Sequence, residues 1–156
     1  MFTPDYFIEK LSLQPHVEGG YYKEVYRSPL TTGNRSLSTT IYFLLQGEQV
    51  SRFHQLTADE IWFFHYGNPI IIYCIDEKGE LSTKKLGLNM EEGESPSLLI
   101  PAKTIFASEM INKNGFALMS CMVSPGFEFT DFKLFSREDL SAAYPQHSHL
   151  TDRLGT

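Results

Sequence analysis

The amino-acid sequence predicts an all-β fold, an antiparallel sandwich or barrel of the jelly-roll type, with a short helix at each end. Ten short runs of strand-like sequence follow one another between about residues 19 and 135, and turn residues separate them. No long helical segment lies between them, which argues against a parallel sheet. The chain has 156 residues, 42% of them hydrophobic, and shows no linker or internal repeat, so we predict a single domain over residues 1–156.

Two helices are predicted to flank the barrel. Thr3 is a good helix cap and favours a helix over about residues 3–12. Ser136 is a similar cap for a second helix over about residues 137–144. The polar residues 147–156, which include His147 and His149, are expected to form a loosely attached tail.

The predicted strands alternate with turns that contain glycine, asparagine or proline. Their ranges are 21–27, 38–45, 49–56, 60–66, 70–75, 80–86, 97–100, 104–110, 116–123 and 127–135.

Charge and hydropathy exclude two classes of partner. With 13 basic and 19 acidic residues the net charge is -6, which disfavours binding to nucleic acid or to anionic lipid. The longest apolar stretch, near residues 69–75, is far shorter than the roughly 20 residues that cross a bilayer. Cys74 and Cys121 lie in apolar runs, and no signal peptide is evident, so we expect buried, reduced thiols in a cytoplasmic protein.

A histidine and a glutamate indicate a pocket inside the barrel. His54 ends one predicted strand and Glu60 begins the next, so alternation can direct both side chains inward, together with Arg52. A buried carboxylate costs roughly several kcal/mol unless it is paired, and Arg52 or His54 would be its partner. Two interpretations of Glu60 remain open, a structural ion pair and a functional acid; His54 could likewise be a hydrogen-bonded core residue.

A second group of polar residues precedes this pair. Tyr22, Glu24 and Tyr26 alternate along one strand, and Glu18 lies just before it. They are candidate ligand-binding residues, although a solvated outer face would also explain them. Arg27 could hold an anionic substrate group or simply end the strand.

Aromatic residues could form the floor of the same pocket. Trp62 and Phe106 are candidates for stacking on a ligand, although most aromatic residues on sheets belong to the core. His65 should point to the opposite face from Glu60, and Cys121 has no nearby basic group to activate it.

These motifs resemble the cupin superfamily. The stretch from Glu60 to Gly67 is similar to the second half of the first cupin motif, and His54 matches its first histidine. Leu56 replaces the second histidine, and Phe106 replaces the histidine of the later motif. The resemblance implies a double-stranded β-helix, the cupin jelly-roll barrel.

The segment His16-Val-Glu-Gly-Gly-Tyr-Tyr22 and the segment beginning Pro125-Gly-Phe resemble one small cupin family of largely uncharacterised bacterial and fungal proteins. This resemblance spans nearly the whole chain. It implies the fold of the RmlC-like deoxysugar epimerases, which are commonly homodimers.

The resemblance leaves three functional hypotheses. The first is an isomerase or epimerase of a carbohydrate-like or nucleotide-sugar-like small molecule, with His54 as base, Glu60 as its acid-base partner and Arg52 stabilising negative charge. The second is a non-catalytic module that binds a small ligand. The third is a metal-dependent enzyme; we predict no cofactor, but a divalent metal would use His54 and Glu60, although two of the four usual cupin ligands are absent.

A homodimer is also expected from the sequence. The run 70–75 is apolar on both faces, and edge strands of an open jelly roll need cover, so we expect a two-fold dimer.

Overall fold

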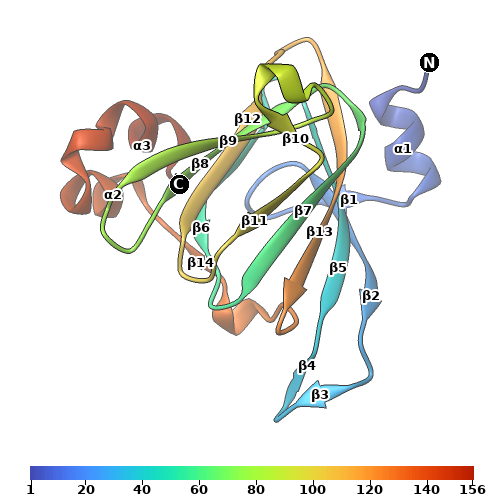
Figure 1. Cartoon of the computed structure of the whole chain (residues 1–156), viewed down its shortest axis with the longest axis horizontal. Coiled ribbons are helices and arrows are strands. Elements are labelled where there is room, and N and C mark those ends of the chain that lie inside the picture. The colour runs from blue at the N-terminus through green and yellow to red at the C-terminus, as the bar shows by residue number, and fades with distance from the viewer.

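The computed structural model describes all 156 residues, and short strands are its main secondary structure (Figure 1). The strands are β1 (Gln14–Pro15), β2 (Tyr21–Arg27), β3 (Thr31–Thr32), β4 (Arg35–Ser36), β5 (Thr39–Gln46), β6 (Val50–Gln55), β7 (Asp59–Gly67), β8 (Ile70–Ile75), β9 (Leu81–Leu86), β10 (Glu94–Ser95), β11 (Ser97–Ile100), β12 (Ile105–Met110), β13 (Phe116–Ser124) and β14 (Lys133–Leu134). The helices are α1 (Pro4–Lys10), α2 (Arg137–Ala143) and α3 (Ser148–Leu154), with 3-10 turns η1 (Met90–Glu92), η2 (Phe129–Asp131) and η3 (Pro145–His147).

Two six-stranded sheets pack face to face and form the barrel. The first has the order β1-β2-β5-β13-β7-β11, and the second has the order β10-β9-β8-β12-β6-β14. The hairpin of β3 and β4 projects from one end of the molecule (Figure 1). The predicted all-β fold is therefore confirmed, and three strands, β2, β8 and β11, have the bounds that the sequence predicts.

The core lies between the sheets, and the helices cover their outer faces. The largest buried cluster fills the interior with side chains such as Phe43, Trp62 and Phe106. Helix α1 packs beside Leu44 and Leu118 on the outside of the first sheet. Helices α2 and α3 cover the outside of the second sheet, so the barrel is enclosed from two sides (Figure 1).

Both helix caps predicted from the sequence are present. The Thr3 hydroxyl accepts a hydrogen bond from the Tyr6 amide at 3.2 Å, and the Ser136 hydroxyl accepts one from the Asp139 amide at 3.0 Å. Each bond satisfies an amide that the first helical turn leaves free, which fixes where the helix begins.

The C-terminal tail does not hang loosely from the barrel, so that prediction is wrong. Residues 148–154 form helix α3, whose Leu150 and Leu154 are buried against the second sheet. The Thr156 amide donates a hydrogen bond to the Phe135 carbonyl at 2.9 Å. The polar composition concealed two leucines at helical spacing, which are enough to anchor one short helix.

The predicted strand over residues 127–135 is also wrong. Only β14 pairs with a neighbour, and the residues before it turn through η2. The Phe127 amide bonds to the Thr39 hydroxyl at 2.9 Å, so it is satisfied by a side chain and not by a strand ladder. The segment Gly126–Phe132 instead crosses the open end of the barrel.

Strand β8 lies inside its sheet, between β9 and β12. Both of its faces are apolar because one packs into the interior and the other lies under helices α2 and α3. The strand therefore needs no dimer partner to cover it, and the homodimer stays a prediction.

None of the helices is both long and apolar enough to cross a membrane. Cys74 and Cys121 are buried and free, as the sequence predicts.

Candidate active site

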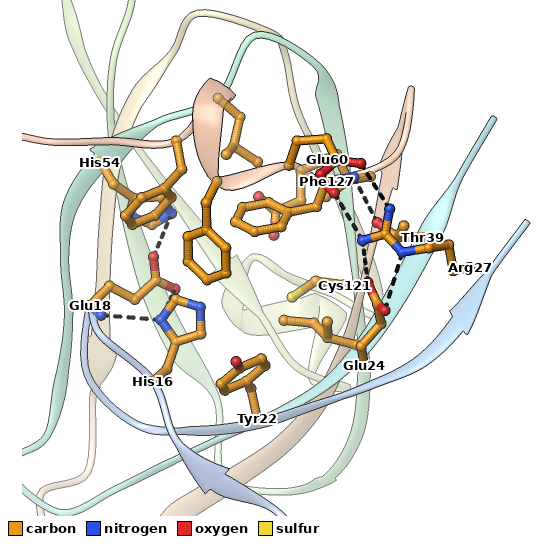
Figure 2. A pocket seen from close by; sticks show the side chains of 16 residues that line it. His16, Glu18, Tyr22, Glu24, Arg27, Thr39, His54, Glu60, Cys121 and Phe127 are labelled. Atoms are coloured by element: carbon orange, nitrogen blue, oxygen red, sulfur yellow. Dashed lines mark hydrogen bonds and ion pairs between the residues drawn. The ribbon is translucent and has the colours of Figure 1, made fainter. Parts of the chain in front are cut away.

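A cavity of about 220 Å³ opens at the end of the barrel that the segment Gly126–Phe132 crosses. Its walls come from β2, β5, β6, β7 and β13, and from the residues between β1 and β2. Figure 2 shows charged and aromatic side chains converging on it. His54 and Glu60 both line this cavity, as the alternation of their strands predicts.

His54 forms a buried ion pair with Glu18. Its Nε2 lies 3.0 Å from a Glu18 carboxylate oxygen (Figure 2). Its Nδ1 lies 2.7 Å from the Arg52 carbonyl oxygen. Burial acts to lower the pKa of His54, but the Glu18 carboxylate outweighs burial and the pKa is raised. His54 is therefore an imidazolium that donates both of its N–H groups, and neither nitrogen is free to accept a proton.

The pKa of Glu18 is shifted in the opposite direction to that of His54. Burial acts to raise the pKa of the Glu18 carboxyl, but His54 outweighs it and the pKa is lowered. The residue precedes Gly19, which has a positive φ of 116° and whose Cβ position would overlap the Val50 carbonyl. Glycine is required there, and this close approach holds Glu18 beneath β6.

Glu60 is the unpaired carboxyl group of the cavity. It is 6% exposed, and its Oε2 has no hydrogen-bond partner. Burial raises the pKa of Glu60 to about 7, although nearby His54 acts to lower it. Glu60 is therefore the group of the pocket that exchanges a proton near neutral pH.

Two further groups stand beside these charges. The His16 Nδ1 accepts a hydrogen bond from the Glu18 amide at 3.1 Å, and Figure 2 shows its other ring nitrogen on the side of the cavity. Burial lowers the pKa of His16, so this imidazole is neutral. The thiol of Cys121 lies next to Glu60, and burial raises the pKa of Cys121 well above its ordinary value, so it stays a thiol.

An ion-pair cluster borders the cavity on one side. Arg27 contacts the Glu24 carboxylate at 2.7 Å, the Glu128 carboxylate at 3.1 Å and the Phe127 carbonyl at 3.0 Å (Figure 2). These bonds tie β2 to the segment Gly126–Phe132. Asp131 pairs with Arg35 at 3.1 Å and anchors the same segment.

The predicted site residues divide into two groups. Glu18, Tyr22 and Glu24 line the cavity together with the central pair. Trp62 and Phe106 do not line it, because both are fully buried in the core, where Phe106 packs against the His54 ring with centroids 4.2 Å apart.

Arg52 and Tyr26 lie outside the cavity because strand irregularities break the alternation. Between His54 and Ser51, β6 shifts its register against β12, and the Arg52 side chain bonds the Gly155 carbonyl at 3.1 Å. A similar shift in β2 leaves Tyr26 51% exposed and turns Arg27 toward the cavity. Their predicted positions in the pocket are wrong.

Several cavity residues carry no assignment from the sequence. They include His16, Glu128 and the three phenylalanines Phe127, Phe129 and Phe132. His16 and Phe127 lie within the two segments that resemble the small cupin family. Those two motifs were the sequence signal that could have identified them as cavity residues. The turn η2 places Phe129 and Phe132 at the cavity. The sequence did not predict this turn, because the aromatic residues of the segment alternate as they would in a strand.

The cavity does not fit the metal centre that many cupin folds carry. Leu56 and Phe106 occupy two of the positions where the cupin motifs place ligands, and both nitrogens of His54 are already bonded. No group of three or more histidine, cysteine or acidic side chains converges in a way that could hold a metal ion. The donor set is too small for a protein metal site.

Comparison with known proteins places this geometry in a family. A crystal structure of a protein from Shewanella oneidensis has 50% sequence identity and a TM-score of 0.96, with 100% of this chain and 99% of that chain covered. A hypothetical protein from Leishmania major has 35% identity and a TM-score of 0.92, with 99% of each chain covered. An uncharacterized protein from Saccharomyces cerevisiae is 31% identical over 85% of this chain and 75% of the yeast protein.

More distant structures share the fold alone. A variant of Bacillus subtilis oxalate decarboxylase has 16% identity and a TM-score of 0.60, with 90% of this chain and 36% of that chain covered. Residues 5–135 match the sequence model of a protein family that is described as "Cupin superfamily (DUF985)". The chain therefore belongs to the DUF985 family of the cupin superfamily.

Proposed function

We propose that this protein is an enzyme of the isomerase or epimerase type, which moves a proton on a small polar metabolite held in the barrel cavity. The observation that carries the proposal is Glu60, a buried carboxyl group with an unpartnered oxygen and a pKa near 7. A general acid-base catalyst works best when its pKa lies near the working pH.

The remaining groups have supporting roles in this proposal. His54 cannot act as the base while both ring nitrogens donate, so its charge stabilises the negative charge that develops when Glu60 removes a proton. Glu18 holds the His54 ring in place. The neutral His16 offers an N–H to the substrate, and Tyr22 is the only tyrosine that lines the cavity, so it is the candidate acid on the other side.

The cavity volume favours a small substrate. Pockets for drug-sized ligands occupy roughly 300–1,000 Å³, whereas this one measures about 220 Å³. A small hydroxy-carbonyl compound suits that space better than a nucleotide sugar does.

The test is hydrogen exchange with solvent. The protein is incubated in D₂O with small hydroxy-aldehydes, hydroxy-ketones and their amino-substituted analogues, and loss of the C–H signal next to the carbonyl is followed by proton NMR. We expect exchange that depends on one ionisation near pH 7 and disappears in Glu60→Gln. A compound that binds in the cavity without exchange at any pH would favour the alternative, a non-catalytic binding module.

A further inference from the structure

The charge balance of the cavity is negative. Four carboxyl groups line it, those of Glu18, Glu24, Glu60 and Glu128, against two cations, Arg27 and His54. His16 is neutral because burial lowers its pKa. The cavity therefore carries two net negative charges when Glu60 is ionised and one when it is protonated, which opposes the entry of an anion.

The cations already have partners, whereas Glu60 does not. Arg27 is shared between Glu24 and Glu128, and the charge of His54 is matched by Glu18 at 3.0 Å. One buried oxygen of Glu60 has no hydrogen-bond partner, and the side-chain donors beside the carboxyl group, the Cys121 thiol and the Trp62 indole, are uncharged. An unpaired buried carboxylate is costly, so a ligand that brings a positive charge would remove that cost.

Aromatic rings form the walls around this carboxyl group. Phe127 and Phe132 stand 5.9 Å apart at 64°, and Phe129 closes against both near the rim. Tyr22 faces them from β2 (Figure 2). Ring faces carry negative potential and attract alkylammonium groups, which shed water more readily than metal ions do.

We propose that the cavity binds a small organic cation, an alkylammonium or protonated amine, with its charge against Glu60 and its alkyl surface against Phe127 and Phe132. This inference names the substrate class of the proposed enzyme and rests on the same site. It separates the cavity from the anion-binding pockets that a nucleotide sugar or a dicarboxylate would need.

The proposal links binding to protonation. The titratable groups that face Glu60 are His54 on β6, Glu18 and His16 before β2, and Cys121 on β13. With Glu18 and His54 held as a pair and Cys121 as a thiol, Glu60 is the group that changes charge near pH 7. A bound cation favours its carboxylate form, so binding near pH 7 releases protons to the buffer.

The experiment uses three probes of similar shape and different charge. Choline is the cation, 3,3-dimethylbutan-1-ol is its uncharged counterpart, and 3,3-dimethylbutanoate is the anion. Binding to the full-length protein is measured by calorimetry at pH 8 and pH 5.5, in two buffers with different ionisation enthalpies at pH 7. We expect choline to bind about 10-fold tighter than the alcohol at pH 8, a smaller ratio at pH 5.5, and proton release at pH 7.

Variants assign the preference to one residue. Glu60→Gln should bind choline and the alcohol with similar affinity, whereas the exposed control Glu91→Gln should keep the 10-fold ratio. If Glu60→Gln does not fold, the parent protein alone still tests the proposal. Its preference for choline over the alcohol should be smaller at pH 5.5 than at pH 8. Equal or weaker binding of choline than of the alcohol, tighter binding of the anion, or no binding of any probe would overturn the proposal. Because no probe is turned over, failure here leaves the exchange experiment unaffected, and failure of exchange leaves this one unaffected.

Discussion

Two glutamates with similarly small exposed fractions behave in opposite ways. Glu60 in the cavity is 6% exposed, and Glu109 on β12 is 5% exposed. Glu109 accepts hydrogen bonds from Arg153, Lys113 and Tyr73, so every oxygen is satisfied. Glu60 has an oxygen with no partner.

Depth of burial and hydrogen-bond partners together set the pKa of a buried carboxyl group. Burial acts to raise the pKa of Glu109, but hydrogen bonds from Arg153 and Lys113 outweigh it and lower the pKa to about 2. Glu60 lies deeper in the protein, and burial raises the pKa of Glu60 to about 7 because the opposing effect of His54 is too small. Glu109 fastens helix α3 to the barrel, whereas Glu60 has no ion-pair partner and one unbonded oxygen.

The largest expected effect is on chemistry. Glu60→Gln should lower the rate of substrate hydrogen exchange by about 1,000-fold, the order that a positioned acid-base group contributes. Glu109→Gln should leave the rate within about two-fold, since Glu109 lies outside the cavity. Rates are measured by proton NMR in D₂O. Equal losses in both variants would show that the two glutamates do not differ in function.

The second expected effect is on stability as a function of pH. The folded pKa of Glu60 lies above its ordinary value, so the folded state binds more protons between pH 4.5 and about 7. The free energy of unfolding that Glu60 contributes therefore falls by about 3 kcal/mol as the pH rises through that window.

Urea unfolding of the protein and of Glu60→Gln measures this effect, because the variant lacks the titrating group. The variant should gain stability relative to the parent as the pH rises from 5 to 8. A constant difference would contradict the raised pKa. For Glu109 the sign is reversed: its stabilisation is present above pH 4.5 and is lost as the pH falls towards 2.

A smaller loss should follow removal of the Glu109 carboxylate itself. Glu109→Ala should lower the free energy of unfolding by about 2 kcal/mol at pH 7, less than for a fully buried pair because Arg153 and Lys113 can be solvated. Denaturant unfolding gives the value, with exposed Glu91→Ala as the control within about 0.5 kcal/mol. No loss in Glu109→Ala would mean that these bonds do not fasten α3.

The smallest effect concerns the cluster beside the cavity. Arg27 and its partners are roughly two-fifths exposed, so Arg27→Gln should cost under about 1 kcal/mol in unfolding free energy. The same change should speed amide hydrogen exchange at Phe127 and its neighbours, because their segment loses its bond to β2. Unchanged exchange there would show that other contacts hold the segment.

The sequence predicts the barrel well because each strand is short, bounded by turns and half-buried. Strict alternation also places His54 and Glu60 correctly. It fails for Arg52 and Tyr26, since one extra residue in a strand reverses every side chain beyond it, and nothing in the residue types marks those positions.

Local sequence patterns could not predict contacts between side chains that are far apart in the chain. The pairing of His54 with Glu18 joins residues far apart in the chain, whereas the sequence suggested that His54 pairs with Glu60. The turn after Pro125 has aromatic spacing that is typical of a strand, but its backbone is bonded by Thr39 and Arg27. Such contacts are fixed only when the barrel closes.

The most direct test of this account is the ionisation of Glu60. The protein is labelled with ¹³C at the glutamate carboxyl carbons, the Glu60 signal is assigned by its absence in Glu60→Gln, and its chemical shift is followed from pH 3 to pH 9. We predict a midpoint of about 7. A midpoint near the ordinary value of 4.5 would contradict it.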